Sequence, residues 1–141
     1  MSQENVEVVR KGFDDFNAFM RGELTREALA ESLDSQHEWH WHDDRMMPDA
    51  PQHLRGAQKA IEYWAQYRIA WVDLTTEPLE FIEAPDDRVL TLTRQSGRGR
   101  DSGLPIEIHY FNVFSIRDGK VWKVELFRHR AEALEAAGLS E

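Results

Sequence analysis

The stretch from Leu104 to Arg128 constrains the fold most, because it has the pattern of two long strands joined by a tight turn. Alternating apolar residues flank Asp118-Gly119 on both sides, and aspartate followed by glycine supplies the positive φ angles that a hairpin needs. Side chains alternate across a strand, so one face should carry every second residue. The residues expected on that face are Ile106, Ile108, Tyr110, Asn112, Phe114 and Ile116 on the first strand and Trp122, Val124, Leu126 and Arg128 on the second.

Two polar residues stand in these apolar rows and predict a lined cavity. Burying a polar group without a partner costs roughly 2–7 kcal/mol, which disfavours a solid core at Asn112 and Arg128. A two-residue loop would split the apolar rows across the two sheet faces. We therefore expect a longer loop, Asp118-Gly119-Lys120, with glycine at a bulge. That register places Asn112 opposite Leu126 and Tyr110 opposite Arg128, so that Tyr110, Asn112 and Arg128 share one cavity.

Composition excludes several classes of function. A chain of 141 residues with 41% hydrophobic and 30% charged residues is expected to form one domain, residues 1–141. The net charge of −9 argues against nucleic-acid partners and anionic membrane surfaces. The absence of cysteine excludes disulfides and thiolate metal sites and suits a cytoplasmic location, which we expect because no apolar leader or membrane span is present.

The order of the remaining elements predicts an α+β domain, in which N-terminal helices pack on one face of an antiparallel sheet. Apolar residues recur at helical spacing from Ser2 to Gly22, and paired tryptophans alternate in the strand that follows. The expected elements are helices at 2–22, from Thr25, at 56–70 and at 131–137, and strands at 37–44, 74–83 and 89–96, with a loop at 43–52.

The motifs ENVEVVRKGFDDFN, HEWHW, LRGAQKAIEYW, FIEAPDDRVLTL, SGRGRDSG, DGKV and EALEAAGL follow one another in a specific order. In this order the chain resembles the NTF2-like superfamily, and within it the SnoaL-like relatives of bacterial polyketide cyclases. The resemblance covers nearly the whole chain and implies a cone, in which a strongly curved antiparallel sheet and N-terminal helices enclose a pocket. Ala18-Phe19-Met20 departs from it as an insertion before the turn that follows the first helix.

The superfamily contains ketosteroid isomerases, epoxide hydrolases, dehydratases and cyclases beside non-catalytic binding domains. The resemblance places Asn112 where the isomerases hold an oxyanion with an aspartic acid, and an amide can also donate there. Trp39 stands in the place of the isomerase base, and Asp15 or Phe16 in that of its tyrosine. Steroid isomerisation is therefore not expected, and Tyr110-Phe111-Asn112 with Arg128 does not supply the epoxide-hydrolase pattern.

Two functions remain open, and both use the pocket. The first is a cofactor-independent cyclase, isomerase or hydrolase acting on an apolar compound with a carbonyl group. In it Asn112 with Tyr110 or Arg128 would polarise the carbonyl, and His40, His42 or Asp43 would supply a base. The second is a non-catalytic module that binds a small apolar organic ligand or a partner. The residues expected to bind the ligand are Trp39, Trp41, Trp64, Phe16, Phe114, Trp122 and Leu126.

The histidines raise the question of a metal. His40 and His42 lie two apart on a predicted strand and share a face, so they could hold a divalent cation with Asp43, Asp44 or His53 as a third ligand. That face is opposite the tryptophans and points away from the pocket. No metal and no other cofactor is therefore expected to be required.

The outward face of the hairpin predicts an association surface. Phe111, Val113 and Phe127 would form an exposed apolar patch on a monomer, and such patches mark interfaces. The resemblance points the same way, because many relatives dimerise through the convex sheet face. We expect a homodimer.

Overall fold

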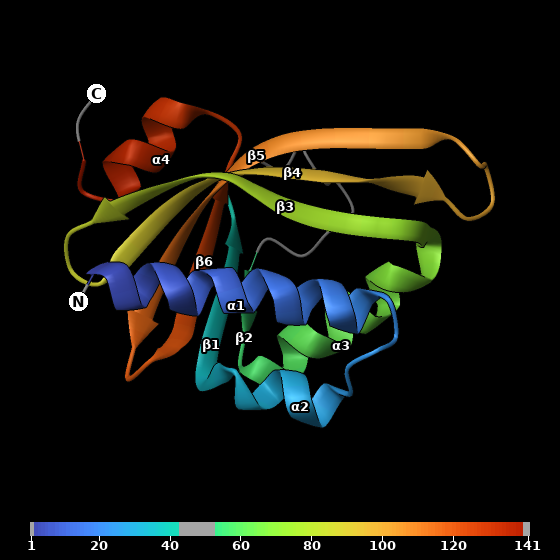
Figure 1. Cartoon of the computed structure of the whole chain (residues 1–141), viewed down its shortest axis with the longest axis horizontal. Helices are drawn as coiled ribbons and strands as arrows, with labels where there is room; N and C mark the ends of the chain where they lie inside the picture. Colours follow the sequence, from blue (N-terminus) through green and yellow to red (C-terminus); the bar gives the residue numbers. More distant parts are fainter. Residues whose placement is uncertain (1, 43–52, 140–141) are drawn as a thin grey trace.

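A computed structural model of the chain describes residues 2–42 and 53–139. It has the expected α+β architecture, with the first helices packed on one face of a curved, open sheet (Figure 1). The elements are α1 (Ser2–Met20), α2 (Arg26–Glu31), β1 (Leu33–Trp41), β2 (His53–Arg55), α3 (Ala57–Tyr67), a 3-10 turn η1 (Arg68–Ala70), β3 (Trp71–Ala84), β4 (Arg88–Gly99), β5 (Pro105–Arg117), β6 (Lys120–Phe127) and α4 (Arg130–Ala136).

The six strands run in the order β2-β1-β6-β5-β4-β3. Neighbouring strands are antiparallel except β1 and β6, which are parallel. In Figure 1, α1 crosses the concave face of the sheet, α2 and α3 lie beside it, and α4 lies on the other face. The concave face and the first three helices therefore enclose the interior of the domain.

The residues that interrupt the family resemblance extend α1 by part of a turn. Ala18, Phe19 and Met20 continue the helix, which ends where Gly22 adopts a φ of 78°. The N–H of Gly22 donates to the carbonyl of Phe19 at 3.0 Å, and that of Glu23 to Ala18 at 2.8 Å, the pattern of a glycine-terminated helix. Phe19 is 1% exposed, so the added residues enlarge the core.

The hairpin has the predicted pairing beyond its turn. Asn112 pairs with Leu126 and Phe114 with Val124, as expected. The loop itself is different, because Arg117 pairs with Lys120 and the turn has only the residues Asp118 and Gly119.

Both turn residues have positive φ, 53° and 73°, which matches the twist of the flanking strands and favours the short turn. The register then shifts by one residue at Trp122, where the strand bulges. Trp122 consequently lies beside the cationic groups of Arg117 and Lys123, 4.8 and 5.0 Å from its ring.

The apolar row on the convex face is covered by the chain's own C-terminal helix. Val113 and Phe127 are 0% and 6% exposed and pack against Ala133 and Leu134 of α4, while Phe111 is half-buried beside them. The exposed patch predicted at Phe111, Val113 and Phe127 is therefore wrong. Its apolar surface is buried within one chain.

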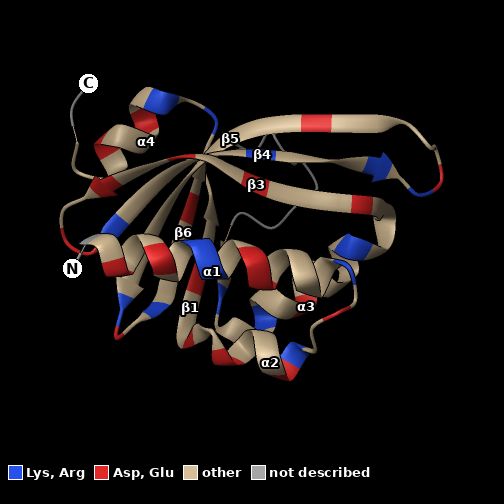
Figure 2. Cartoon of the chain, viewed as in Figure 1, with Lys and Arg blue, Asp and Glu red and all other residues tan. Residues whose placement is uncertain are grey.

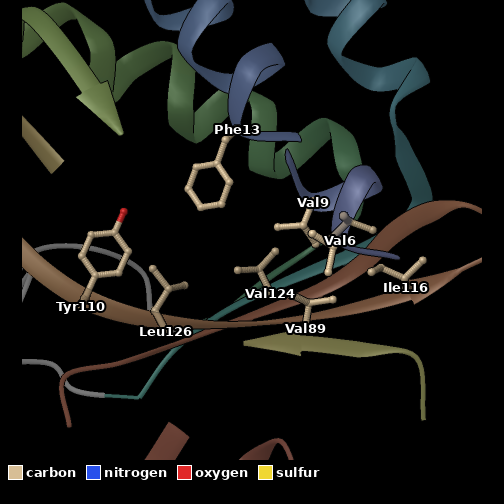
Figure 3. Close-up of a cluster of buried hydrophobic side chains, with 9 residues drawn as sticks. Val6, Val9, Phe13, Val89, Tyr110, Ile116, Val124 and Leu126 are labelled. Atoms are coloured by element: carbon tan, nitrogen blue, oxygen red, sulfur yellow. The ribbon is translucent and has the colours of Figure 1, made fainter. Parts of the chain in front are cut away.

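A second apolar cluster joins α1 to the concave face of the sheet. Figure 3 shows Val6, Val9 and Phe13 of α1 facing side chains that rise from the strands. The strand residues of this cluster are Val89, Tyr110, Ile116, Val121, Val124 and Leu126. The hydroxyl of Tyr110 points away from the sheet and toward the helices (Figure 3).

Candidate functional site

A cavity of about 300 Å³ lies between the first three helices and the concave face of the sheet. Its wall is largely aromatic. The aromatic residues that line it are Phe13, Phe16, Trp39, Trp41, Tyr63, Trp64, Tyr67, Tyr110 and Phe114. Charged lining residues are exposed Lys11, Glu31 and Lys120, which mark the rim where α1, the end of α2 and the hairpin turn meet. The interior is therefore mainly apolar and aromatic, and its polar lining residues include Thr76, Gln95 and Asn112.

Most of the residues predicted to bind a ligand line this cavity, and two do not. Phe16, Trp39, Trp41, Trp64 and Phe114 are part of its wall. Leu126, at 0% exposure, is packed in the core cluster instead. Trp122 sits at the bulge near the hairpin turn, outside the wall.

The predicted polar cluster is incomplete, because Arg128 is not in the cavity. β6 ends at Phe127, and Arg128 is exposed in the bend that leads to α4. A guanidinium is strongly hydrated, so a strand end next to solvent keeps it out of an apolar interior. Tyr110 and Asn112 do line the cavity. The prediction that Asn112 and Arg128 share it is wrong.

None of the three bases proposed from the sequence is found in the cavity wall formed by the described residues. His40 lies on the face of β1 opposite Trp39 and Trp41, bonded to Glu38. His42 is exposed and stacks on Phe127, with ring centroids 4.5 Å apart. Asp43, and with it the loop expected at 43–52, lies outside the described residues.

Trp64 of α3 is at the centre of the aromatic wall. The rings of Phe16 and Trp39 meet it edge to face, at centroid distances of 5.2 and 5.1 Å, the arrangement that aromatic quadrupoles favour. Trp41 extends the row along β1, 6.0 Å from Trp39. The indole N–H groups of Trp39, Trp41 and Trp64 are buried and have no acceptor among the described residues. Such unpaired donors suit a ligand that carries oxygen acceptors.

Asn112 is fixed by a chain of hydroxyl groups on the floor of the cavity. The hydroxyl of Thr93 donates to the amide oxygen of Asn112 at 2.6 Å. Because that proton is used, Thr93 accepts the bond of 2.9 Å from Thr91. The amide oxygen is occupied, so the N–H groups of Asn112 are what it can offer to a bound molecule.

Two tyrosines add neutral hydroxyl groups to the wall. Burial strongly raises the pKa of Tyr110, which is 6% exposed, and burial also raises the pKa of Tyr67 to about 12. Both phenols are therefore protonated at neutral pH. The Tyr67 hydroxyl donates to the Gln95 amide oxygen at 3.0 Å, and the Gln95 amide donates to the Thr76 hydroxyl at 3.3 Å.

Sequence reasoning missed Thr76, Gln95 and Tyr67. The signal was present in the alternation of β3 and β4, since Thr76 pairs with Gln95 on the concave face. α1 supports this end of the cavity through Asn17, whose amide exchanges two bonds of 2.8 Å with the backbone of Thr76.

His37 is a fourth missed residue and the one imidazole in the cavity wall among the described residues. Its Nδ1 lies 3.2 Å from the carbonyl oxygen of Val121, and a carbonyl only accepts, so Nδ1 carries the proton. Nε2 is then an unprotonated nitrogen, buried and without a partner. Burial lowers the pKa of His37 and keeps the ring neutral. The sequence could have indicated this, because His37 lies two residues before Trp39 and four before Trp41 and therefore shares their face of β1.

Charge is distributed over the whole molecule. Figure 2 shows acidic residues on helices and strands alike, interspersed with basic ones. Within residues 2–42 and 53–139, no helix combines the length and the apolar character that crossing a membrane requires.

Comparison with solved structures shows the same fold in several proteins. The protein Bal32a, from a soil-derived mobile gene cassette, is 18% identical with a TM-score of 0.74, over 96% of this chain and 97% of its own. A candidate SnoaL-like polyketide cyclase from Jannaschia sp. CCS1 is 20% identical with a TM-score of 0.73, over 97% and 92%. The epoxide hydrolase/cyclase-like enzyme SalBIII, of pyran ring formation in salinomycin, is 18% identical with a TM-score of 0.70, over 91% and 92%.

The comparison with curated proteins found no match. A family model, in contrast, matches most of the chain, from residue 9 to residue 124. This range includes α1 from its second turn, the cavity wall apart from Val8, and the hairpin up to Val124. The chain belongs to the SnoaL-like domain family.

Proposed function

We propose that the cavity binds a small, flat, largely apolar organic compound that carries a carbonyl group. The observation that supports this most directly is the composition of the wall, in which aromatic rings surround the neutral donors of Asn112 and Tyr110. A volume of about 300 Å³ is at the lower end of the range for small-molecule sites. The ligand is therefore a compact one.

The donors and acceptors of the wall indicate the ligand's polarity. Asn112 offers N–H groups, the phenol of buried Tyr110 is protonated, and the indole N–H groups of Trp39, Trp41 and Trp64 have no acceptor among the described residues. Each unpaired buried donor costs about 1–3 kcal/mol, which a ligand oxygen would recover after a small ring rotation. No buried carboxylate lines the described wall. This favours an acceptor-rich, uncharged molecule over a cation.

We further propose a catalytic role, as a cofactor-independent cyclase, isomerase or hydrolase. His37 favours it, because an unprotonated imidazole nitrogen at a cavity wall can accept a proton near neutral pH. The names of the structural relatives, among them a cyclase and an epoxide hydrolase/cyclase-like enzyme, support this class of chemistry.

The positions of the base and the donors limit the substrate. His37 is four residues from Trp41 along β1, or about 13 Å at 3.3 Å per residue. Trp41 aligns through Leu126 with Asn112, so the base and the carbonyl donors meet opposite ends of a ligand. A conjugated carbonyl compound satisfies this, because charge released at one end reaches the oxygen at the other. In the alternative function, the protein binds such a compound without changing it.

The binding proposal is tested by thermal shift with pairs of flat ketones or quinones and hydrocarbons of the same shape. The carbonyl compounds should stabilise the protein more than their hydrocarbon partners. Asn112→Leu, which keeps the volume and removes one donor, should reduce that difference, whereas Trp122→Phe, outside the cavity, should keep it. Equal binding of both members of every pair, or no binding at all, would refute the proposal.

Catalysis is tested separately with His37→Gln. A hit compound incubated with the protein should be converted, and the variant should bind it but convert it at least tenfold more slowly. Conversion at the full rate by the variant would show that His37 is not the base. Binding without conversion by the unmodified protein would support the non-catalytic alternative.

Homodimerisation through the convex face also stays a prediction. Of the three residues on which it was based, only Phe111 retains partial exposure. Sedimentation at micromolar concentration tests it, and a monomer there would contradict it.

A further inference from the structure

On the convex side of the sheet, away from the cavity, we propose a binding site for a divalent transition metal, Zn²⁺ or a similar cation. Its ligands would be Glu38 and His40 of β1 and His53 of β2. One potential ligand atom from each of these residues lies within 4.8 Å of the other two. The family resemblance gave no reason to expect this site.

The pairing of β1 with the edge strand β2 brings the three residues together. Glu38 and His40 are two apart and share the face opposite Trp39, and His53 is the direct cross-strand partner of His40. Figure 1 shows β1 and β2 side by side. Two histidines and one carboxylate from rigid backbone are a ligand set that zinc and iron sites use.

The distances suit a common cation. The Nε2 atom of His40 lies 2.9 Å from Oε1 of Glu38, and Nε2 of His53 lies 3.5 Å from the same oxygen. In a tetrahedral zinc site with bonds of about 2.0–2.1 Å, neighbouring ligand atoms are about 3.3–3.4 Å apart. The two observed separations lie on either side of this value.

The contacts of His53 indicate which of its ring nitrogens could bind a metal. The Nε of Arg55 donates to Nε2 of His53 at 3.4 Å, so this nitrogen carries a lone pair. It faces a carboxylate oxygen of Glu38 at 3.5 Å, so a positive charge near both of these acceptors would be stabilised. Arg55 supplies part of it, and a metal ion at the same place would supply more.

Metal entry would rearrange three side-chain contacts. The carboxylate of Glu38 only accepts, so its 2.9 Å bond to His40 needs a proton on Nε2 of His40, and that proton must leave before Nε2 can bind a metal. The rings of His40 and His53 are stacked, with centroids 3.9 Å apart and planes inclined by 21°, so they must open for both lone pairs to converge on one ion. The ion would also displace the Arg55 contact. Arg55 therefore competes with the metal, and replacing Arg55 with an uncharged residue should tighten metal binding.

His42, which the sequence paired with His40, is not part of the ligand set. Its ring is stacked on Phe127 with planes inclined by 3°, and its Nε2 is 3.2 Å from the carboxylate of Glu125. The neighbouring Lys123 is 3.7 Å from that same carboxylate. This second carboxylate is thus already shared by two partners.

A bound ion would link β1 to β2, because Glu38 and His40 are on the first strand and His53 is on the second. β2 has three residues and leads through Gly56 into α3, whose Trp64 forms the centre of the cavity wall. A ligand that binds only the folded state stabilises it. The proposed site would therefore anchor the edge of the sheet next to the helix that closes the cavity.

The experiment is isothermal titration of untagged, chelator-treated protein with ZnCl₂. We expect one zinc per chain, and at least a tenfold rise in Kd in His40→Gln and in His53→Gln. His109→Gln is the matched control, because His109 is exposed on a strand beside Glu107, at 3.8 Å, and belongs to no three-residue ligand group within the described part of the chain. Its Kd should be unchanged.

Arg55→Gln separates this site from non-specific binding, since loss of the competing cation should tighten zinc binding at least threefold. Zinc should also raise the Tm of the unmodified protein and leave that of His53→Gln unchanged. Because His53 and Arg55 are exposed, both variants should fold, and the Tm of each without metal checks this. Absence of stoichiometric zinc, an equal loss in His109→Gln, or weaker binding in Arg55→Gln would overturn the proposal.

Discussion

Replacing Thr93 with valine tests the chain of hydroxyl groups that holds Asn112 in place. Valine has nearly the same shape as threonine but cannot donate or accept a hydrogen bond. The substitution leaves the amide oxygen of Asn112 without its donor and the hydroxyl of Thr91 without its acceptor. Thr91 and Thr93 are 0% exposed and Asn112 is 4% exposed, so solvent cannot easily replace these bonds.

The expected cost follows from the two groups left unpaired. Each buried polar group without a partner costs about 1–3 kcal/mol. Asn112 borders the cavity, where water can satisfy part of its need, so we expect Thr93→Val to lower the free energy of unfolding by about 2–4 kcal/mol in total. For a domain of this length that corresponds to a fall in Tm of about 6–12 °C.

A double variant identifies the origin of the loss. In Thr93→Val with Asn112→Leu, both partners of the 2.6 Å bond are apolar, and removing both partners costs much less than stranding one. The double variant should therefore lose about 1–2 kcal/mol less than the sum of the single variants. Urea unfolding followed by tryptophan fluorescence measures all three, and the slope with urea should stay constant.

Thr75→Val is the matched control, because Thr75 is an exposed threonine on the neighbouring strand β3. Its effect should stay within about 0.5 kcal/mol. Additive losses in the double variant would mean that Thr93 and Asn112 do not share a bond. A loss in Thr93→Val no larger than that of the control would refute the buried network altogether.

Three further predictions concern other parts of the fold. Phe19→Ala should lower the free energy of unfolding by about 3–5 kcal/mol in urea, because the ring is fully buried; a loss below 1 kcal/mol would contradict a core role for the inserted residues. Gly138→Ala should cost about 1–2 kcal/mol in the same assay, since the residue has a φ of 79° and the added methyl would lie 2.8 Å from a guanidinium nitrogen of Arg88. Burial lowers the pKa of His37, so as the pH falls the unfolded chain takes up a proton at this residue before the folded protein does. The contribution of His37 to the free energy of unfolding is therefore complete above about pH 6.5 and declines below it. An equally steep decline in His37→Gln would show that other groups cause it.

Most of the fold could be predicted from the sequence, because its signals are local. Apolar residues at helical spacing, alternation in the strands and Asp118-Gly119 at the turn each specify one element. The parallel pairing of β1 with β6 was not predicted. Alternation indicates which residues face the core, but it does not specify which strand lies next to which.

The hairpin shows how a register can be right when the loop is wrong. A three-residue loop and a two-residue turn with one bulged residue contain the same number of unpaired residues. Beyond Trp122 both therefore place Asn112 opposite Leu126, as observed. Trp122, which takes the bulge in place of Lys120, was therefore assigned to the wrong surroundings.

The errors in the site have a different cause, namely the use of strand alternation beyond the end of the strand. Arg128 would have faced the cavity if β6 had continued for one more residue, but the chain bends there toward α4. His37 was overlooked for the opposite reason. It lies within the strand and in phase with Trp39, but the pair His40 and His42 was a more conspicuous pattern.

The convex face shows why a patch predicted from one strand depends on the rest of the chain. Ala133, Leu134 and Ala137 form an apolar stripe on the last helix, and such a stripe on a short helix needs a surface to cover. The surface that this stripe covers includes Val113 and Phe127 of the hairpin and Leu90 of β4. Once α4 covers them, their hydrophobicity is explained within one chain, and it therefore gives no information about a second copy.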